Sequence, residues 1–141
     1  MARPLTVDKD FKAAHQVIDE GLEIDRALAN RASNKSDVQF DLSTGQLAAG
    51  ILLNAEGRPK QALLQLRQSL QTRQRLADAQ PGGSSTYSHD IGEAMHSLVE
   101  TPGSNLSWTD FGRSPNSWKS QGVLQPADEL WLEEARAHGA P

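Results

Sequence analysis

Two histidines and a glutamate, the side chains of this sequence best suited to hold a metal ion, lie in one short segment. His89, Glu93 and His96 are spaced by four and three residues, so an α-helix places them on one face. Both residue types bind zinc. The histidines are seven positions apart, about 10.5 Å of helical rise, and one ion cannot join all three without distortion. We predict no metal and no cofactor, and keep a metal-dependent enzyme using these residues as the least favoured alternative.

The sequence also lacks the patterns of nucleophilic and phosphate-transfer enzymes. Three serines between positions 84 and 88 lie near His89, but neighbours on a turn do not form a catalytic triad. The pair at Gly82 and Gly83 is not followed by the lysine of a phosphate-binding loop. The absence of cysteine excludes disulfides and thiolate metal sites. We therefore predict a non-catalytic protein.

Charge and hydropathy narrow the classes of partner. The 141 residues include 14 basic and 18 acidic side chains, and the net charge of −4 disfavours nucleic acid. No apolar run approaches the roughly 18 residues of a membrane span, and the N-terminal residues lack the apolar core of a signal peptide. We expect a soluble cytoplasmic protein of one domain. Its hydrophobic content of 37% suits a thin helical arrangement better than a deep globular core.

The segment 46–79 predicts two helices folded back on each other. Gly57 can take the left-handed conformation that ends a helix, and Pro59 suits the first turn of the next one. Apolar residues recur with helical spacing on both sides of this joint. They are Leu47, Ala48, Ile51 and Leu52 before it, and Leu63, Leu66, Leu70 and Leu76 after it. Gly50 is expected to let the two helices approach closely.

Helical spacing and chain breakers place further helices around this pair. We expect a short arm over 1–7, helices over 8–32, 37–54, 59–79 and 86–100, a short helical turn over 114–122 and a final helix over 127–138. Ser36 with Gln39, and Ser107 with Asp110, have the spacing of capping boxes. Gly21, inside the first helix, costs about 1 kcal/mol relative to alanine and indicates a close neighbour.

The chain changes character near residue 103. We predict a helical repeat region over 1–103 and a short helical tail over 104–141 packed on the same domain. The tail contains all three tryptophans, Trp108, Trp118 and Trp131. Because the ends of a repeat array expose apolar faces that need cover, we expect this tail to be a cap. An aromatic partner-binding patch is the alternative.

Two stretches of the chain about 48 residues apart are similar to each other. Ala14 aligns with Ala62, and Leu22 aligns with Leu70. A period of this length is typical of stacked pairs of helices.

A family resemblance is carried by Gly50, Gly57, Ala62, Leu53 and Leu66. Their relative spacing is similar to that of tetratricopeptide repeats, and residues 12–99 resemble the extended-period bacterial type. The tail departs from the pattern, because no second alanine-bearing helix follows residue 103. The resemblance implies an all-α fold of antiparallel helical hairpins stacked as a short solenoid. It also implies binding of a protein or peptide on a concave helical face, without catalysis.

We predict from these features a non-catalytic adaptor or scaffold that binds another protein or peptide. The candidate partner-binding residues are Gln46, Asn54, Arg67, Gln71, Arg73, Tyr87, Trp118 and Trp131. Charge changes at Arg67 or Arg73 are expected to weaken the binding of a partner and to leave the thermal melting of the protein unchanged. The alternatives are a small inhibitor or immunity-type protein that masks an enzyme or effector, and a homodimer formed through an exposed end of the stack.

Overall fold

The computed structural model describes residues 5–32, 34–79, 85–121 and 124–141, without the side chains of 5–9, 85–87, 116–118, 120 and 121. The regular structure of these residues is entirely helical, which confirms the all-α prediction. The elements are α1 (Leu5–Arg31), α2 (Ser36–Ala55), α3 (Pro59–Asp78), α4 (Ser85–Val99), α5 (Trp108–Gln121), the 3₁₀ turn η1 (Pro126–Asp128) and α6 (Glu129–Ala137).

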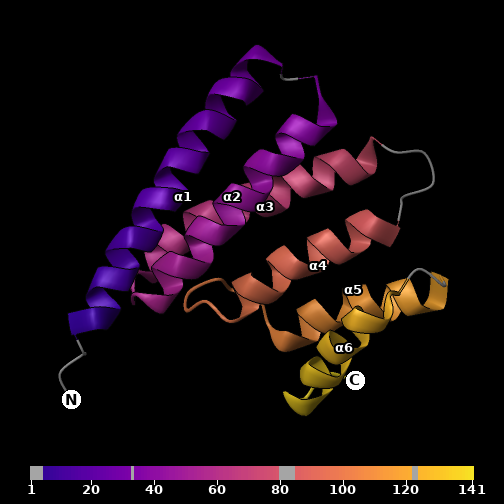
Figure 1. The fold of residues 1–141 in the computed structure, drawn as a ribbon. Coiled ribbons are helices and arrows are strands. Elements are labelled where there is room, and N and C mark those ends of the chain that lie inside the picture. The colour runs from indigo at the N-terminus through magenta and orange to yellow at the C-terminus, as the bar shows by residue number, and fades with distance from the viewer. Residues whose placement is uncertain (1–4, 33, 80–84, 122–123) are drawn as a thin grey trace.

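The helices pack in the order in which they occur in the chain. The main contacts join α1 to α2, α2 to α3, α3 to α4, α4 to α5 and α5 to α6. In Figure 1, α1 (indigo) lies along one edge of the molecule, and α5 and α6 (orange to yellow) form the opposite edge. None of the helices in the described ranges has the length and apolarity needed to cross a bilayer.

The joint between α2 and α3 has the predicted chemistry. Gly57 adopts φ 78°, a conformation that L side chains disfavour, and Pro59 is the first residue of α3. The chain is closed by hydrogen bonds from the Arg58 amide to the Leu53 carbonyl (2.9 Å) and from the Gly57 amide to the Asn54 carbonyl (3.1 Å). These bonds satisfy carbonyls that the end of α2 leaves without helical partners.

The core between α2, α3 and α4 depends on a close approach at Gly50. A Cβ atom added there would lie 2.5 Å from Cγ of Leu66, whose side chain is fully buried. Gly50 therefore brings α2 against α3, as predicted. The buried apolar residues of this core are Leu47, Leu63, Leu66, Ala94 and Leu98. The helical spacing of Leu47, Ala48, Ile51 and Leu52 predicts that Ile51 points inward with the others, and that is wrong: the buried face of α2 passes through Gly50, and Ile51 is turned toward solvent.

Helix α1 packs on α2 through a second glycine. A Cβ atom at Gly45 would lie 2.9 Å from Leu22 and 3.3 Å from Asp25, so these two α1 side chains face α2. His15 of α1 also pairs with Glu56 at the end of α2. These contacts fix which side of α1 is turned toward the rest of the chain.

Three predicted helix boundaries are wrong. Helix α1 begins at Leu5, so part of the expected arm is helical. The N-cap of α2 is Lys35 and no side chain caps it, because Ser36 is already the first helical residue. Helix α5 begins at Trp108 and continues through Pro115, which is buried. A proline inside a helix loses one backbone hydrogen bond; the packing of its ring in the interior offsets that loss.

The start of α5 explains its greater length. The Asp110 amide donates to Ser107 Oγ (3.0 Å) and the Ser107 amide donates to Asp110 Oδ2 (3.4 Å). This reciprocal pair is the capping box that the sequence predicts. The hydrogen bonds from the Ser107 side chain and backbone hold the pKa of Asp110 below its usual value. The helix thus nucleates seven residues before Pro115.

The C-terminal helices form a second core against α4. Its buried residues are Phe111, Ala135 and Ala140, and the half-buried side chains around it are Met95, Val99, Trp108 and Trp131. Gln125 and Asp128 form a capping box that opens the final helical segment. Two of the three tryptophans are therefore packed between α4, α5 and α6.

Candidate functional site

The eight side chains predicted for partner binding differ widely in exposure. Gln46 and Arg73 are buried, Asn54 and Trp131 are half-buried, Arg67 and Gln71 are exposed, and the side chains of Tyr87 and Trp118 lie outside the described set. A partner can reach Arg67 and Gln71 without rearrangement. Nη2 of the exposed Arg67 lies 3.5 Å from the carbonyl oxygen of Ser104.

Arg73 has a structural role. The sequence predicts that changing its charge weakens the binding of a partner and leaves thermal melting unchanged, and its burial argues against that prediction. Its side chain is 1% exposed. Its guanidinium donates to Ser43 Oγ (3.1 Å), Thr44 Oγ1 (3.2 Å), the Asp90 carbonyl (2.7 Å) and Glu93 Oε1 (3.0 Å). These partners lie on α2 and α4, so Arg73 ties three helices together. Substitution there must affect stability because it leaves several polar groups without their donor.

The structure gives different partners to the three residues of the predicted histidine face. Glu93 accepts a hydrogen bond from Arg73. His89 places Nδ1 2.5 Å from Oδ1 of Asp128, which is fully buried. His96 turns toward the carboxylates of Glu100, four residues later in the chain, and of Glu134 on α6. A single ion bound by His89, Glu93 and His96 has no support in this geometry.

A different cluster forms around His96. Its Nε2 atom lies 2.8 Å from Oε2 of Glu134 on α6 and 3.1 Å from Oε1 of Glu100. The three ligand atoms lie within 4.8 Å of one another. One imidazole nitrogen and two carboxylates make a donor set that zinc accepts when water completes the coordination. Sequence spacing shows Glu100 four residues after His96, but only the fold brings Glu134 there.

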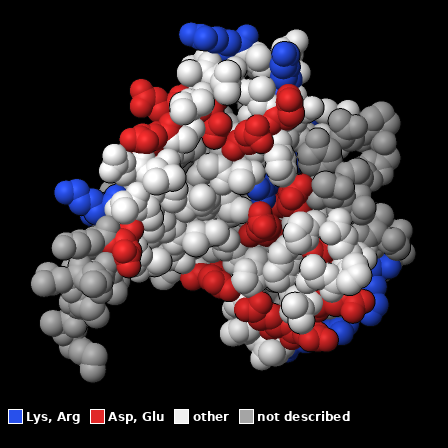
Figure 2. Space-filling model, viewed as in Figure 1, with Lys and Arg blue, Asp and Glu red and all other residues white. Residues whose placement is uncertain are grey.

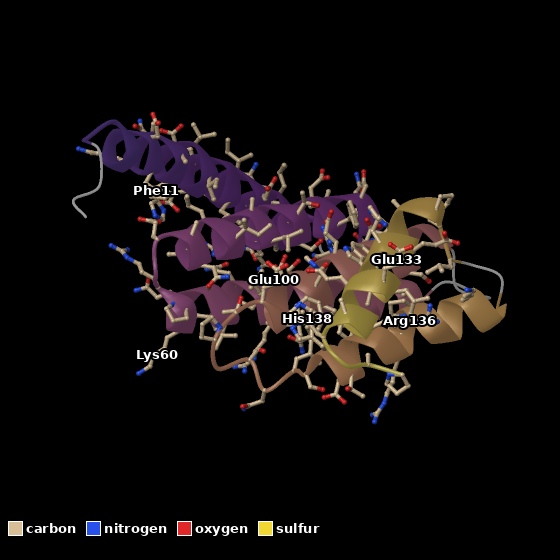
Figure 3. The ribbon with its side chains drawn as sticks, turned by 90° about the horizontal axis from the view of Figure 1, so that it is seen from below. Phe11, Lys60, Glu100, Glu133, Arg136 and His138 are labelled. Carbon is tan, nitrogen blue, oxygen red and sulfur yellow. The ribbon has the colours of Figure 1, made fainter. Side chains whose placement is uncertain are left out.

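Aromatic rings hold the imidazole of His96, and that of the neighbouring His89, in place. Trp131 stacks on His89 with centroids 5.1 Å apart, and on His96 with centroids 6.0 Å apart. Phe111 meets His96 edge-on at 5.6 Å. Such packing orients His96 toward Glu100 and Glu134. In Figure 3 Glu100 is labelled near the middle of the view, and Glu133, the residue before Glu134 in α6, is labelled to its right. Packing within the chain therefore explains the position of Trp131, and no binding partner is needed to explain it.

One face of α1 carries large apolar side chains in solvent. Val17 is 70% exposed, Ile24 61% and Leu28 47%. Val17 is five residues from Leu22, roughly 140° around the helix, so it points away from α2. We define the α1 stripe as Ala14, Val17, Gly21, Ile24 and Leu28. Sequence periodicity shows α1 to be apolar but does not separate this stripe from the face that packs on α2.

Gly21 lies in the middle of the α1 stripe and has open space beside it. The sequence predicts a close neighbour for this glycine, and in the described chain that prediction is wrong. Apart from its own helix backbone, no heavy atom of the described residues comes within 4 Å of a Cβ placed there. Packing within the described chain therefore gives no reason for a residue that weakens the helix.

Comparison with protein-family models, curated proteins and solved structures finds no match.

Proposed function

We propose that this chain is a non-catalytic protein-binding module, acting as a cytoplasmic adaptor or scaffold, and that it binds a helical partner along the α1 stripe. The observation that carries the proposal is the exposure of Val17, Ile24 and Leu28 side by side on one helix. Contiguous apolar surface that stays in water is a mark of interaction sites. Anchors at spacings of three, four and seven residues are typical of helix-on-helix recognition.

The repeat-like part of the proposal has support from packing. The close approach of Gly50 to Leu66 and the full burial of Ala62 occur at residues that carry the tetratricopeptide resemblance. The C-terminal helices cover one side of α4, as a cap would. The proposed architecture is a short stack of helical hairpins over 1–103 closed by the tail over 104–141.

Surface charge supports a protein partner over a polyanion. Figure 2 shows acidic side chains gathered over α1 and α2 and again around α6. On α1 the residues Asp19, Glu20 and Glu23 are exposed. Such a surface repels nucleic acid phosphates.

The test is protein capture with a matched pair of variants. Val17→Glu combined with Ile24→Glu places charges in the α1 stripe, and Leu64→Glu places one at an exposed leucine (58%) of α3, outside that stripe. We expect the stripe variant to lose the proteins captured by the wild type, and Leu64→Glu to keep them, with both remaining helical by circular dichroism. Equal capture by all three proteins would reject the proposal.

The same capture separates the alternatives within this proposal. Several partners indicate an adaptor. A single partner bound tightly enough to block its activity indicates the inhibitor or immunity-type protein.

A second candidate function, binding of one divalent cation, is favoured by the convergence of His96, Glu100 and Glu134. Its test is zinc titration of metal-free, untagged protein by calorimetry. This function requires one equivalent in the wild type and its loss in His96→Ala. His138→Ala is the control, because His138 stacks on Trp108 at 4.1 Å and is not part of the cluster. No stoichiometric binding by the wild type rejects this function.

A further inference from the structure

We infer that the partner of the α1 stripe is a second copy of this chain, whose α1 lies antiparallel to the first and forms a two-fold symmetric homodimer. The inference rests on the proposed function and adds the identity and orientation of the partner. It comes from the positions of the exposed residues along α1.

The α1 stripe continues into charged residues with a regular spacing. The positions are Asp10, Ala14, Val17, Gly21, Ile24, Leu28 and Arg31, at steps of four, three, four, three, four and three. This is the a/d spacing of a coiled-coil seam, sustained over three heptads. Asp10 and Arg31 are exposed, as are the three large apolar residues between them. The seam lies within the 27 residues of α1, a helix about 40 Å long.

The seam is complementary to itself in the antiparallel direction. Reversing α1 about the middle of the Asp10–Arg31 seam brings Val17 opposite Ile24 of the second copy, and Ile24 opposite Val17. The same operation brings Asp10 opposite Arg31 at both ends, so two pairs of opposite charge flank the apolar centre. A two-fold interface needs a patch that matches itself in this way.

Gly21 lies at the centre of this arrangement. The two-fold operation that pairs Val17 with Ile24 brings Gly21 next to its own copy and Ala14 next to Leu28. Small residues at a helix crossing allow the backbones to approach closely, and a small residue opposite a large one fills the seam evenly. The open space beside Gly21 in the single chain is then filled by the second copy.

The parallel orientation is disfavoured by the same residues. It would set Asp10 against Asp10 and Arg31 against Arg31, and like charges in register oppose association. The apolar register and the glycine are compatible with the antiparallel orientation, and the charge pattern selects it.

Single cysteines test the orientation, because the natural chain has none. We expect Gly21→Cys to form a covalent dimer under a short thiol cross-linker, since its two copies meet. Asp10→Cys alone should not, because in the antiparallel dimer its two copies lie about 30 Å apart. An equal mixture of Asp10→Cys and Arg31→Cys should cross-link. Leu64→Cys on α3 is the control and should not. A covalent dimer from Asp10→Cys alone would overturn the orientation.

Analytical ultracentrifugation tests the association itself. We expect wild-type protein to approach twice the monomer mass of 15.3 kDa as concentration rises. Val17→Glu with Ile24→Glu should weaken the dimer at least about tenfold, and Leu64→Glu should leave it unchanged. A wild type that stays monomeric at all concentrations overturns the inference. If such a monomer still captures another protein through the α1 stripe, the proposed function stands and only the second copy is rejected.

Discussion

Arg73 on α3 donates from Nη1 to Oε1 of Glu93 on α4 across 3.0 Å. This contact commits Glu93 to a structural role and separates it from the two histidines on the same helix. It joins α3 to α4, as does the hydrogen bond to the Asp90 carbonyl, while the bonds to Ser43 and Thr44 reach back to α2. The guanidinium therefore stabilises the packing of three helices.

Arg73→Ala should destabilise the fold strongly. The substitution removes four hydrogen bonds from a buried cation and leaves a cavity beside Phe40, whose ring lies 5.2 Å from the guanidinium carbon. We expect a loss of about 2–4 kcal/mol in the free energy of unfolding, measured by urea denaturation. The exposed Arg67→Ala should change it by less than about 0.5 kcal/mol. Similar losses in both variants would contradict the structural role of Arg73.

Replacement of glycine by alanine should have opposite effects on stability at Gly50 of α2 and at Gly21 of α1. Gly50→Ala forces a methyl group against buried Leu66, and we expect a loss of about 1–3 kcal/mol. Gly21→Ala meets open space in a helix interior and should gain up to about 1 kcal/mol. Thermal melting at a concentration where the chain is monomeric measures both effects. A destabilised Gly21→Ala monomer would show that Gly21 has a close neighbour within its own chain.

At neutral pH, the carboxylate of Asp90 should make the protein less stable than an asparagine side chain at the same position would. Burial raises the pKa of Asp90 above its ordinary value of 3.8, although Arg73 partly lowers it. Its Oδ2 atom finds no hydrogen-bond partner among the described residues. A raised pKa means that the favourable contribution is complete below 3.8 and is lost as pH rises through the folded-state value. Asp90→Asn should therefore melt higher at neutral pH, and the difference should shrink on acidification.

Asp110→Asn provides a comparison of opposite sign. The hydrogen bonds from Ser107 lower the pKa of Asp110, so its contribution is present above 3.8 and is lost as pH falls through the lower folded-state value. Asp110→Asn should melt lower than the wild type at neutral pH and approach it in acid. Melting curves collected over the same pH series decide both cases. Parallel curves for the two variants would count against these assignments.

Asp128→Ala should lower the free energy of unfolding more than Glu129→Ala does. Asp128 is fully buried, lies 2.5 Å from His89 Nδ1 and accepts a hydrogen bond from the Gln125 amide. We expect about 2–4 kcal/mol of destabilisation, because two half-buried donors lose their buried acceptor. Glu129 is exposed, and Glu129→Ala should have little effect. Chemical denaturation of the two variants gives the comparison.

Local features of the sequence were sufficient to predict most helices. The joint at Gly57 and Pro59 and the capping box of Ser107 and Asp110 depend on a few consecutive residues, and both were predicted correctly. The starts of α1 and α5 were not, since the β-branched Thr6 and Val7 have weaker helix preferences and Pro115 disfavours a helix interior. Packing overrides such preferences.

The candidate sites were less predictable because they depend on tertiary contacts. An arginine in an amphipathic helix is usually solvated, and nothing local to Arg73 indicates its burial. His96 and Glu134 are 38 residues apart, so their contact exists only once α6 packs on α4. The outward direction of the α1 stripe depends on which face α2 covers. Periodicity alone shows only that α1 is apolar on more than one side.

The order in which the helices pack also bears on how the chain folds. Because each helix makes its main contacts with the next one in sequence, the contacts are short-range along the chain. Low contact order favours rapid folding, and it allows the ends to open while the centre stays formed. The amides of α1 and α6 should exchange with deuterium sooner than those of α2 and α3. A partner that clamps α1 would then slow exchange at the end of the chain that opens first.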